Sequence, residues 1–89
     1  MKLEFDRSFS KSLNRGMDSN ILKKIENIMT EIESAKSLKD IRNLKKLVGF
    51  QNYYRIKLGS YRIGIELIDK SKIRFIIITH RKDIYKKFP

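Results

Sequence analysis

Three cationic side chains recur on both sides of a short Gly-Ser sequence, in a pattern that suits phosphate binding. Arg55 and Lys57 precede Gly59-Ser60 at alternate positions, and Arg62 follows it. A guanidinium can hold a phosphate through two parallel hydrogen bonds, and an ammonium adds a compact positive charge. If the two segments are paired strands, the three cations share one face and form a phosphate-binding surface. The plainer interpretation is a solvated face whose cations repel one another.

A second group of reactive side chains lies near the end of the sequence, in the run His80-Arg81-Lys82-Asp83-Ile84-Tyr85. On a helical turn, Arg81 and Tyr85 are four residues apart and share a face. His80 is the single histidine of the chain, and a structural role is the usual one for such a residue. Imidazole and phenol groups exchange protons, so this run adds acid–base chemistry to the phosphate-binding surface.

The charge balance favours an anionic partner. The 89 residues include 21 lysines and arginines against 10 aspartates and glutamates, which gives a formal net charge of +11. A field of this sign attracts nucleic acid, the ribosome, an acidic protein or an anionic membrane surface. With no cysteine and one histidine, we expect neither disulfides nor a metal site, and no cofactor.

The hydropathy pattern predicts a cytoplasmic protein without a membrane anchor. No apolar run approaches the roughly 20 residues that span a bilayer. Met1 to Ser10 alternates charged with apolar residues and lacks the apolar centre of a signal peptide.

Hydrophobic spacing predicts the elements that position these side chains. Residues 2–5 alternate as a short strand. Asp6 can cap a helix that runs to Arg15, and Gly16 separates it from a second helix that Asp18 caps. The second helix has an apolar stripe at helical spacing, made of Ile21, Leu22, Ile25, Ile28, Met29 and Ile32.

Residues 35–52 are richer in lysine and have a weaker pattern. A short helix capped by Ser37 and then an extended piece are expected. Within the extended piece, Lys45 and Lys46 form either a basic rim that meets phosphates or a solvated loop. From residue 53 the period is two, which predicts strands over 53–58, 61–68 and 72–79. The last residues, 81–88, are expected to make one or two helical turns.

A two-residue loop at Gly59-Ser60 fixes which residues of the first two strands face each other. On one side the pairs are apolar: Leu58 with Tyr61, Ile56 with Ile63, and Tyr54 with Ile65. On the other side Lys57 faces Arg62, Arg55 faces Gly64, and Tyr53 faces Glu66. Like charges directly opposite each other destabilise a sheet, so their presence favours a functional interpretation. Gly64 is expected to leave room for a ligand beside the backbone.

The third strand extends this pattern. The run Phe75 to Ile78 is apolar on both faces, which indicates a strand inside the sheet. A three-residue loop over 69–71 places Arg74 beside Glu66 and Ile76 beside Gly64. The same register predicts that His80 ends its strand on the cationic side, near the Gly59-Ser60 turn.

At this point three segments resemble the RelE/ParE toxin superfamily. They are Leu44-Lys45-Lys46-Leu47-Val48-Gly49-Phe50, Tyr54-Arg55-Ile56-Lys57-Leu58-Gly59-Ser60-Tyr61-Arg62-Ile63-Gly64 and His80-Arg81-Lys82-Asp83-Ile84-Tyr85. The likeness covers nearly the whole chain. It implies one RelE/ParE-like toxin domain over residues 1–89, of the α+β class. In that fold an N-terminal strand and a helical hairpin pack on one face of a mostly antiparallel, twisted sheet of about four strands, followed by a short C-terminal helical tail.

The resemblance also implies an activity. RelE-like proteins are ribosome-dependent endonucleases that cut messenger RNA, and their pattern has cations at the positions of Arg55, Lys57, Arg62 and Arg81. A tyrosine often stands near the C-terminus, here Tyr85, and many relatives have a histidine like His80. RNA cleavage by its own 2′-hydroxyl needs no metal, so the protein has to position the chain, neutralise charge and move protons.

In that mechanism Arg62 and Arg81 hold the scissile phosphate, while Arg55 and Lys57 bind flanking phosphates or neutralise charge. His80, Tyr85 or Glu66 takes the 2′-proton. The partners implied by the family are the ribosome, messenger RNA and a cognate antitoxin with an acidic, disordered segment.

Other functions fit the same pattern less fully. A ParE-like inhibitor of DNA gyrase shares the fold but keeps less of the basic and aromatic set. A general nucleic-acid-binding module would bind with steep salt dependence and no cleavage. A third alternative is an inactive relative that only binds RNA or the antitoxin.

Overall fold

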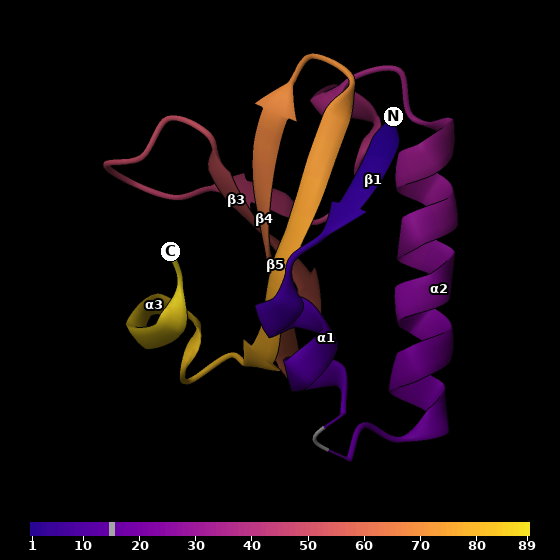
Figure 1. Cartoon of the computed structure of the whole chain (residues 1–89), viewed down its shortest axis with the longest axis vertical. Helices are drawn as coiled ribbons and strands as arrows, with labels where there is room; N and C mark the ends of the chain where they lie inside the picture. The colour runs from indigo at the N-terminus through magenta and orange to yellow at the C-terminus, as the bar shows by residue number, and fades with distance from the viewer. Residues whose placement is uncertain (15) are drawn as a thin grey trace.

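One mixed β-sheet organises the molecule, with a long helix on one face and a short C-terminal helix on the other (Figure 1). The computed structural model describes residues 1–14 and 16–89. The elements are β1 (Lys2–Phe5), α1 (Arg7–Leu13), α2 (Ser19–Ser34), the 3₁₀ helix η1 (Leu38–Asp40), β2 (Leu44–Lys46), β3 (Tyr53–Leu58), β4 (Tyr61–Asp69), β5 (Lys72–His80) and α3 (Ile84–Lys87).

The sheet has five strands in the order β1-β5-β4-β3-β2, and only β1 with β5 is a parallel pair. The predicted α+β class is therefore confirmed, as is the internal position of β5. The extra strand is β2, which the sequence indicated only as an extended piece. Three residues are too few to show a period of two, so its pairing with β3 emerges only in the folded chain.

The predicted caps form at the starts of α1 and α2, whereas Ser37 makes no side-chain cap at η1. The Asp6 carboxylate accepts a hydrogen bond from the Ser8 amide at 3.1 Å, and that of Asp18 accepts one from the Ile21 amide at 2.9 Å. The first helix ends at Leu13, earlier than predicted, and Arg15 lies outside the described residues. None of the helices in the described chain has the length and apolarity needed to cross a bilayer.

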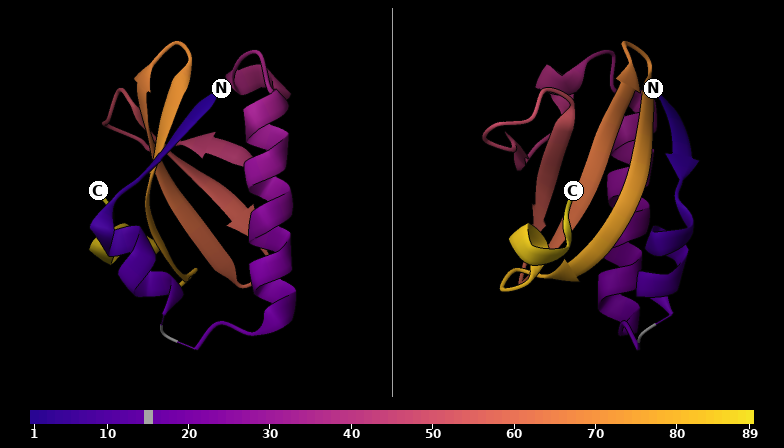
Figure 2. Two further views of the ribbon diagram at one scale, coloured as in Figure 1. Left: turned by 45° about the vertical axis from the view of Figure 1, so that its right-hand side comes forward. Right: turned by 60° about the vertical axis from the view of Figure 1, so that its left-hand side comes forward.

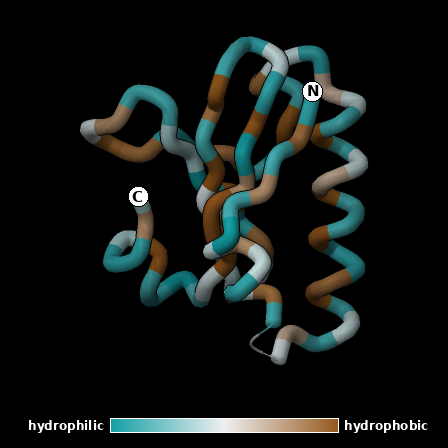
Figure 3. Tube along the Cα trace, viewed as in Figure 1, coloured by the Kyte–Doolittle hydropathy of each residue, from teal (hydrophilic) through white to brown (hydrophobic). Residues whose placement is uncertain are grey.

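Helix α2 runs along one face of the sheet (Figure 2), and its apolar stripe faces the sheet (Figure 3). Ile25 and Ile32 are buried, while Leu22 remains 40% exposed at the margin. Each fully buried isoleucine contributes about 1.5–3 kcal/mol to folding. The stripe packs on the apolar pairs of β3 and β4, together with Phe9 and Phe75. This cluster is the main core, and it leaves the opposite face of the sheet to other groups.

Helix α1 completes the outer edge of β5 beyond the end of β1. The Asp6 amide donates to the Phe75 carbonyl at 2.8 Å, and the Ser8 hydroxyl donates to the Ile76 carbonyl. The Ile78 amide then donates to the hydroxyl of Ser12, at 3.1 Å. The side chains of Ser8 and Ser12 thus satisfy the backbone groups of Ile76 and Ile78 on the part of the β5 edge that β1 leaves unpaired.

The register between β4 and β5 differs from the predicted one. Glu66 pairs with Arg74 as expected, but Gly64 pairs with Ile77 because Ile76 is an extra residue in a β-bulge. A second irregularity at Ile68 makes the turn after β4 one residue shorter than predicted. From the bulge onward every residue of β5 is displaced by one position relative to the expectation.

Candidate functional site

Four cations occupy adjacent positions on the sheet face opposite α2. In the β3–β4 hairpin Lys57 faces Arg62 and Arg55 faces Gly64, so the predicted register is confirmed. Strand β2 adds Lys45, which pairs directly with Arg55. Paired residues point to the same side of a sheet, so these side chains share one surface. We refer to Lys45, Arg55, Lys57 and Arg62 as the cationic face.

Neutral backbone oxygens hold the two arginines of the cationic face. Arg62 Nη1 donates to the carbonyls of Gly59 and Tyr61, at 2.8 Å each. Arg55 Nη1 donates to the carbonyl of Asn43 at 3.2 Å. Among the ion pairs of the described residues, none includes a member of the cationic face. These contacts orient the guanidinium groups without neutralising them, which leaves their charge for an anion.

Two other arginines, one in β5 and one just after η1, have the opposite arrangement. Arg74 bonds to Glu4 at 3.0 Å and lies 3.8 Å from Glu66, and Arg42 bonds to Glu31 at 3.1 Å. The hydrogen bond from Arg74, with help from Lys72, holds the pKa of Glu4 below its usual range. The predicted Arg74–Glu66 pair therefore forms, although Glu4 is the closer carboxylate. Carboxylates thus offset the charge of Arg42 and Arg74, unlike that of the arginines of the cationic face.

The space beside Gly64 is filled, contrary to the prediction that a ligand would approach there. A Cβ at this position would lie 2.7 Å from Cγ of Phe88. Phe88 and Ile84 are buried with Leu47 in a second apolar cluster, on the same side of the sheet as the cationic face. The C-terminal tail folds back onto the sheet because burial of the apolar side chains of Ile84 and Phe88 is favourable. The absence of a side chain at Gly64 allows the Phe88 ring to contact the backbone there.

The tail places Tyr85 next to β2. Tyr85 is 65% exposed and lines a groove together with Lys45, Lys46 and Phe50. Arg81 precedes the helix: its amide donates to the Ser60 carbonyl at 2.8 Å, which fixes its backbone beside the Gly59-Ser60 turn. The prediction that Arg81 and Tyr85 share a helical face is wrong. Residues 81–83 form a turn and α3 begins only at residue 84.

His80 lies on the other side of the sheet from its predicted place. It pairs with Tyr61, and the two rings meet edge to face with centroids 6.0 Å apart. Tyr61 belongs to the side that packs under α2. The bulge at Ile76 causes this difference, because one additional residue inverts the facing of all later residues in β5. Thr79 takes the position opposite Arg62 instead.

Two residues near the cationic face were not predicted from the sequence. Thr79 faces Arg62 only because of the bulge, and no sequence signal marks that bulge. Phe50 is 45% exposed and held by an edge-to-face contact with Tyr53, with centroids 5.8 Å apart. Its position in the lysine-rich segment 44–50 was the available signal. Within the described residues, no three histidine, aspartate or glutamate side chains gather where they could hold a metal ion.

Comparison with known proteins relates the chain to small toxins. A curated relative, toxin RelE3 of Methanocaldococcus jannaschii, is 42% identical over 90 positions that cover 100% of both chains. A crystal structure of a RelB–RelE antitoxin–toxin complex from Methanococcus jannaschii matches at 40% identity with a TM-score of 0.79, covering 97% of this chain and 99% of that one.

A RelE–RelB complex from Pyrococcus horikoshii has the same fold, with a TM-score of 0.70 at 18% identity over 93% of this chain and 97% of that one. No protein-family profile matches the chain. The fold is that of a small toxin of the α+β class. At 42% identity over the full length, the chain belongs to the RelE family of toxins.

Proposed function

We propose that this chain is an endoribonuclease that cleaves messenger RNA on the ribosome and so inhibits translation. The observation that supports this most directly is the cationic face, where Lys57 and Arg62 lie directly opposite each other. Two cations in this relation cost stability, and the described residues supply no carboxylate to offset it. An anion bound between the strands removes the repulsion, and a phosphodiester has the right charge and shape for a guanidinium.

The reaction requires no group beyond the RNA and the protein. The 2′-oxygen of one nucleotide forms a bond to the adjacent phosphorus, and the bond from phosphorus to the 5′-oxygen breaks. The 2′-proton passes to a base and the 5′-oxygen takes a proton, which leaves a cyclic phosphate and a 5′-hydroxyl. The charge that builds on the phosphate oxygens is stabilised by fixed cations, the kind of contact that contributes most to such steps.

Within this mechanism Arg62 and Arg81 hold the scissile phosphate, since both are tied to the Gly59-Ser60 turn. Arg55 and Lys57 neutralise the transition state. We assign the uptake of the 2′-proton to Tyr85, which is exposed and lines a groove with Lys45 of the cationic face. His80, paired with Tyr61 at the end of β5, contacts RNA rather than the reacting atoms. Lys45, which pairs with Arg55, binds a phosphate farther along the RNA, whereas Lys46 pairs with Tyr54 and lies outside the cationic face.

A cognate antitoxin is the proposed regulator of this activity. The relatives from Methanococcus jannaschii and Pyrococcus horikoshii were crystallised as complexes with RelB. A net charge of +11 favours an acidic segment in the partner of this chain. Such a segment binds as an extended, initially disordered chain, and it blocks RNA if it covers the cationic face.

The test is expression of the wild-type chain and of Arg62→Ala, followed by mapping of RNA 5′-ends in the cells. We expect new 5′-ends within coding regions for the wild type and a loss of about 10²–10³-fold for the variant, the range seen when one charge-stabilising group is removed. Arg42→Ala is the matched control, because Arg42 is 83% exposed and bonds to Glu31 away from the cationic face.

Circular dichroism of purified Arg62→Ala establishes that the variant is folded. Undiminished cleavage by the folded variant refutes the assigned role of Arg62. Toxicity accompanied by DNA breaks and intact messages would replace the nuclease proposal with gyrase inhibition.

A further inference from the structure

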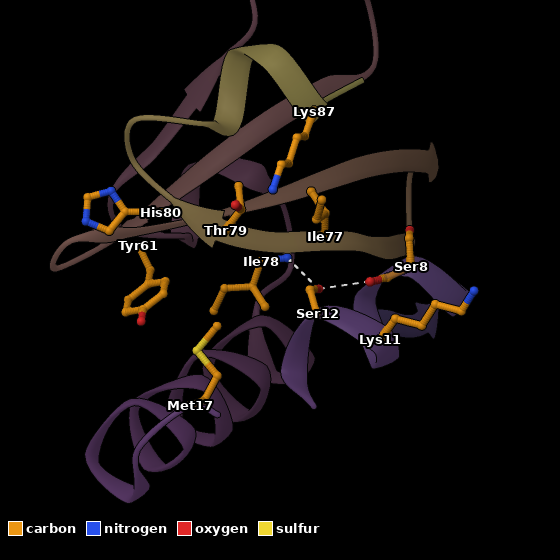
Figure 4. A pocket seen from close by; sticks show the side chains of 10 residues that line it. All are labelled: Ser8, Lys11, Ser12, Met17, Tyr61, Ile77, Ile78, Thr79, His80 and Lys87. Carbon is orange, nitrogen blue, oxygen red and sulfur yellow. Dashed lines mark hydrogen bonds between the residues drawn. The ribbon is translucent and has the colours of Figure 1, made fainter. Parts of the chain in front are cut away.

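We propose that the outer edge of β5 is a second anion site, which binds a nucleotide of the RNA beyond the one that is cut. This inference rests on the proposed function, because it names where the same RNA chain continues. The site is a hollow of about 330 Å³ between α1 and the C-terminal tail (Figure 4). We call it the edge groove and define it by Lys11, Met17, Tyr61, Thr79, His80 and Lys87.

The charge of the edge groove is wholly positive or neutral. Lys11 comes from α1 and Lys87 from α3, and Figure 4 shows Lys87 reaching toward β5. Neither lysine takes part in an ion pair of the described chain. The carboxylate of Asp6 is bound to Ser8 in the first turn of α1 and does not line the groove. A ligand with phosphate charge is therefore favoured over a cation.

Hydrogen-bond donors and an apolar wall complete the groove. Nδ1 of His80 accepts a hydrogen bond from the Lys82 amide at 3.3 Å, and the ring lines the groove beside Tyr61. The hydroxyls of Tyr61 and Thr79 add further polar groups, and Met17 supplies apolar surface. By contrast, the Ser12 hydroxyl is already committed to backbone partners. This combination suits a sugar and a base attached to a phosphate.

The edge groove adjoins the cationic face at the outer edge of β5, where Thr79 faces the side of Arg62 while Tyr61 and His80 line the groove from the α2 side of the sheet. Thr79, which lines the groove, lies directly opposite Arg62 across β4 and β5. Neighbouring strands are about 4.8 Å apart. An RNA strand that passes from Lys57 on β3 to Arg62 on β4 therefore has to continue by one more such spacing to reach Thr79 on β5. An RNA strand whose scissile phosphate is at Arg62 can therefore place a neighbouring nucleotide between Lys11 and Lys87.

The test measures RNA binding separately from cleavage. The probe is a fluorescent single-stranded RNA whose 2′-hydroxyls are methylated, so that it cannot be cut. Fluorescence anisotropy gives the affinity of wild type and of Lys11→Gln/Lys87→Gln over a series of salt concentrations. Each phosphate contact on a single strand contributes about 0.7 to the salt slope. We expect the double variant to lose about 1.4 from the slope and to bind severalfold more weakly at low salt.

Lys23→Gln/Lys39→Gln is the matched control, since it removes the same charge from two exposed positions outside the groove. An equal change of slope in both double variants overturns the inference, because net charge alone would then explain the effect. So does an unchanged slope in Lys11→Gln/Lys87→Gln. If that variant keeps its RNA affinity but loses antitoxin binding, the groove holds an acidic protein segment and the RNA assignment is wrong.

Nuclear magnetic resonance locates the contact independently. Addition of the methylated RNA to the wild type should shift the amide signals of Thr79 and His80, and these shifts should vanish in Lys11→Gln/Lys87→Gln. Absence of shifts at both residues while signals of Lys57 and Arg62 move would overturn the inference and leave the proposed function standing. Shifts at the groove in a chain that cleaves no RNA in cells would instead keep the groove and refute the nuclease.

Discussion

The ring of Phe88 lies directly against the backbone of Gly64, at a point where any side chain on residue 64 would be only 2.7 Å from the ring. This contact joins the C-terminal tail to the centre of the sheet. It also fixes the groove in which Tyr85 lies beside Lys45 and Lys46, because Phe88 lines that groove as well. One glycine in β4 therefore determines where the tail presents its exposed tyrosine.

Gly64→Ala should displace the tail. The added methyl group meets Phe88 in a packed position, and overpacking of this kind costs about 1–3 kcal/mol. For a domain of this size each kcal/mol corresponds to about 4–8 °C in the unfolding temperature. Calorimetry of Gly64→Ala, Phe88→Ala and the double variant tests the contact. The cost of Gly64→Ala should disappear when Phe88 is already alanine, and purely additive costs would show that the ring is not the cause.

Lys57→Gln should leave the fold as stable as the wild type, or stabilise it by about 0.2–1 kcal/mol, because the charge opposite Arg62 is removed. The same change should weaken RNA binding. Urea unfolding and the anisotropy assay measure the two effects on one preparation, and Lys23→Gln on the outer face of α2 serves as the comparison. A clear loss of stability in Lys57→Gln would mean that Lys57 has a structural role.

Two substitutions of Tyr85 separate proton transfer from contact with a base. Tyr85→Phe keeps the ring and removes the hydroxyl, so a tyrosine that takes the 2′-proton should lose about 10²–10⁴-fold in cleavage with this change. A tyrosine that only stacks should tolerate phenylalanine and fail with alanine. Single-turnover cleavage on programmed ribosomes gives the rates, and Tyr53→Phe on β3 controls for loss of an unrelated hydroxyl.

Stability should fall in acid as the carboxylates at the sheet edge and on α2 become protonated. Hydrogen bonds from Arg74 and Lys72 lower the folded-state pKa of Glu4, and a hydrogen bond from Arg42 lowers that of Glu31. A lowered folded-state pKa contributes stability above the unfolded value of about 4.3, and this contribution is lost as the pH falls through the folded-state value.

The unfolding temperature should therefore decline below about pH 4, and Glu4→Gln should have a shallower decline than the wild type. Glu26→Gln, at an exposed position of α2, should follow the wild-type curve. Parallel curves for Glu4→Gln and the wild type would show that the Arg74 and Lys72 contacts contribute nothing measurable.

Local chemistry made a large part of this structure predictable. Asp6 and Asp18 cap helices because a carboxylate accepts the free amides of a first turn. Gly59 has a φ of +56°, which its place at the start of a two-residue hairpin loop requires. From that loop the register of β3 and β4 follows residue by residue, and with it the shared surface of Arg55, Lys57 and Arg62. These features depend on residues close together in the sequence.

The facing of His80 and Thr79 and the position of the C-terminal tail depend on contacts between residues far apart in the sequence, so only the folded structure determined them. A bulge at Ile76 moved His80 to the Tyr61 side and Thr79 to the Arg62 side, because sheet faces alternate with a period of two and one inserted residue inverts them. The tail closed over Gly64 because Ile84 and Phe88 required burial, which no pattern near Gly64 indicates. The sequence by itself thus determined that the chain has a cationic hairpin on an α+β fold. Only tertiary packing determined which aromatic, hydroxyl and imidazole groups stand beside it.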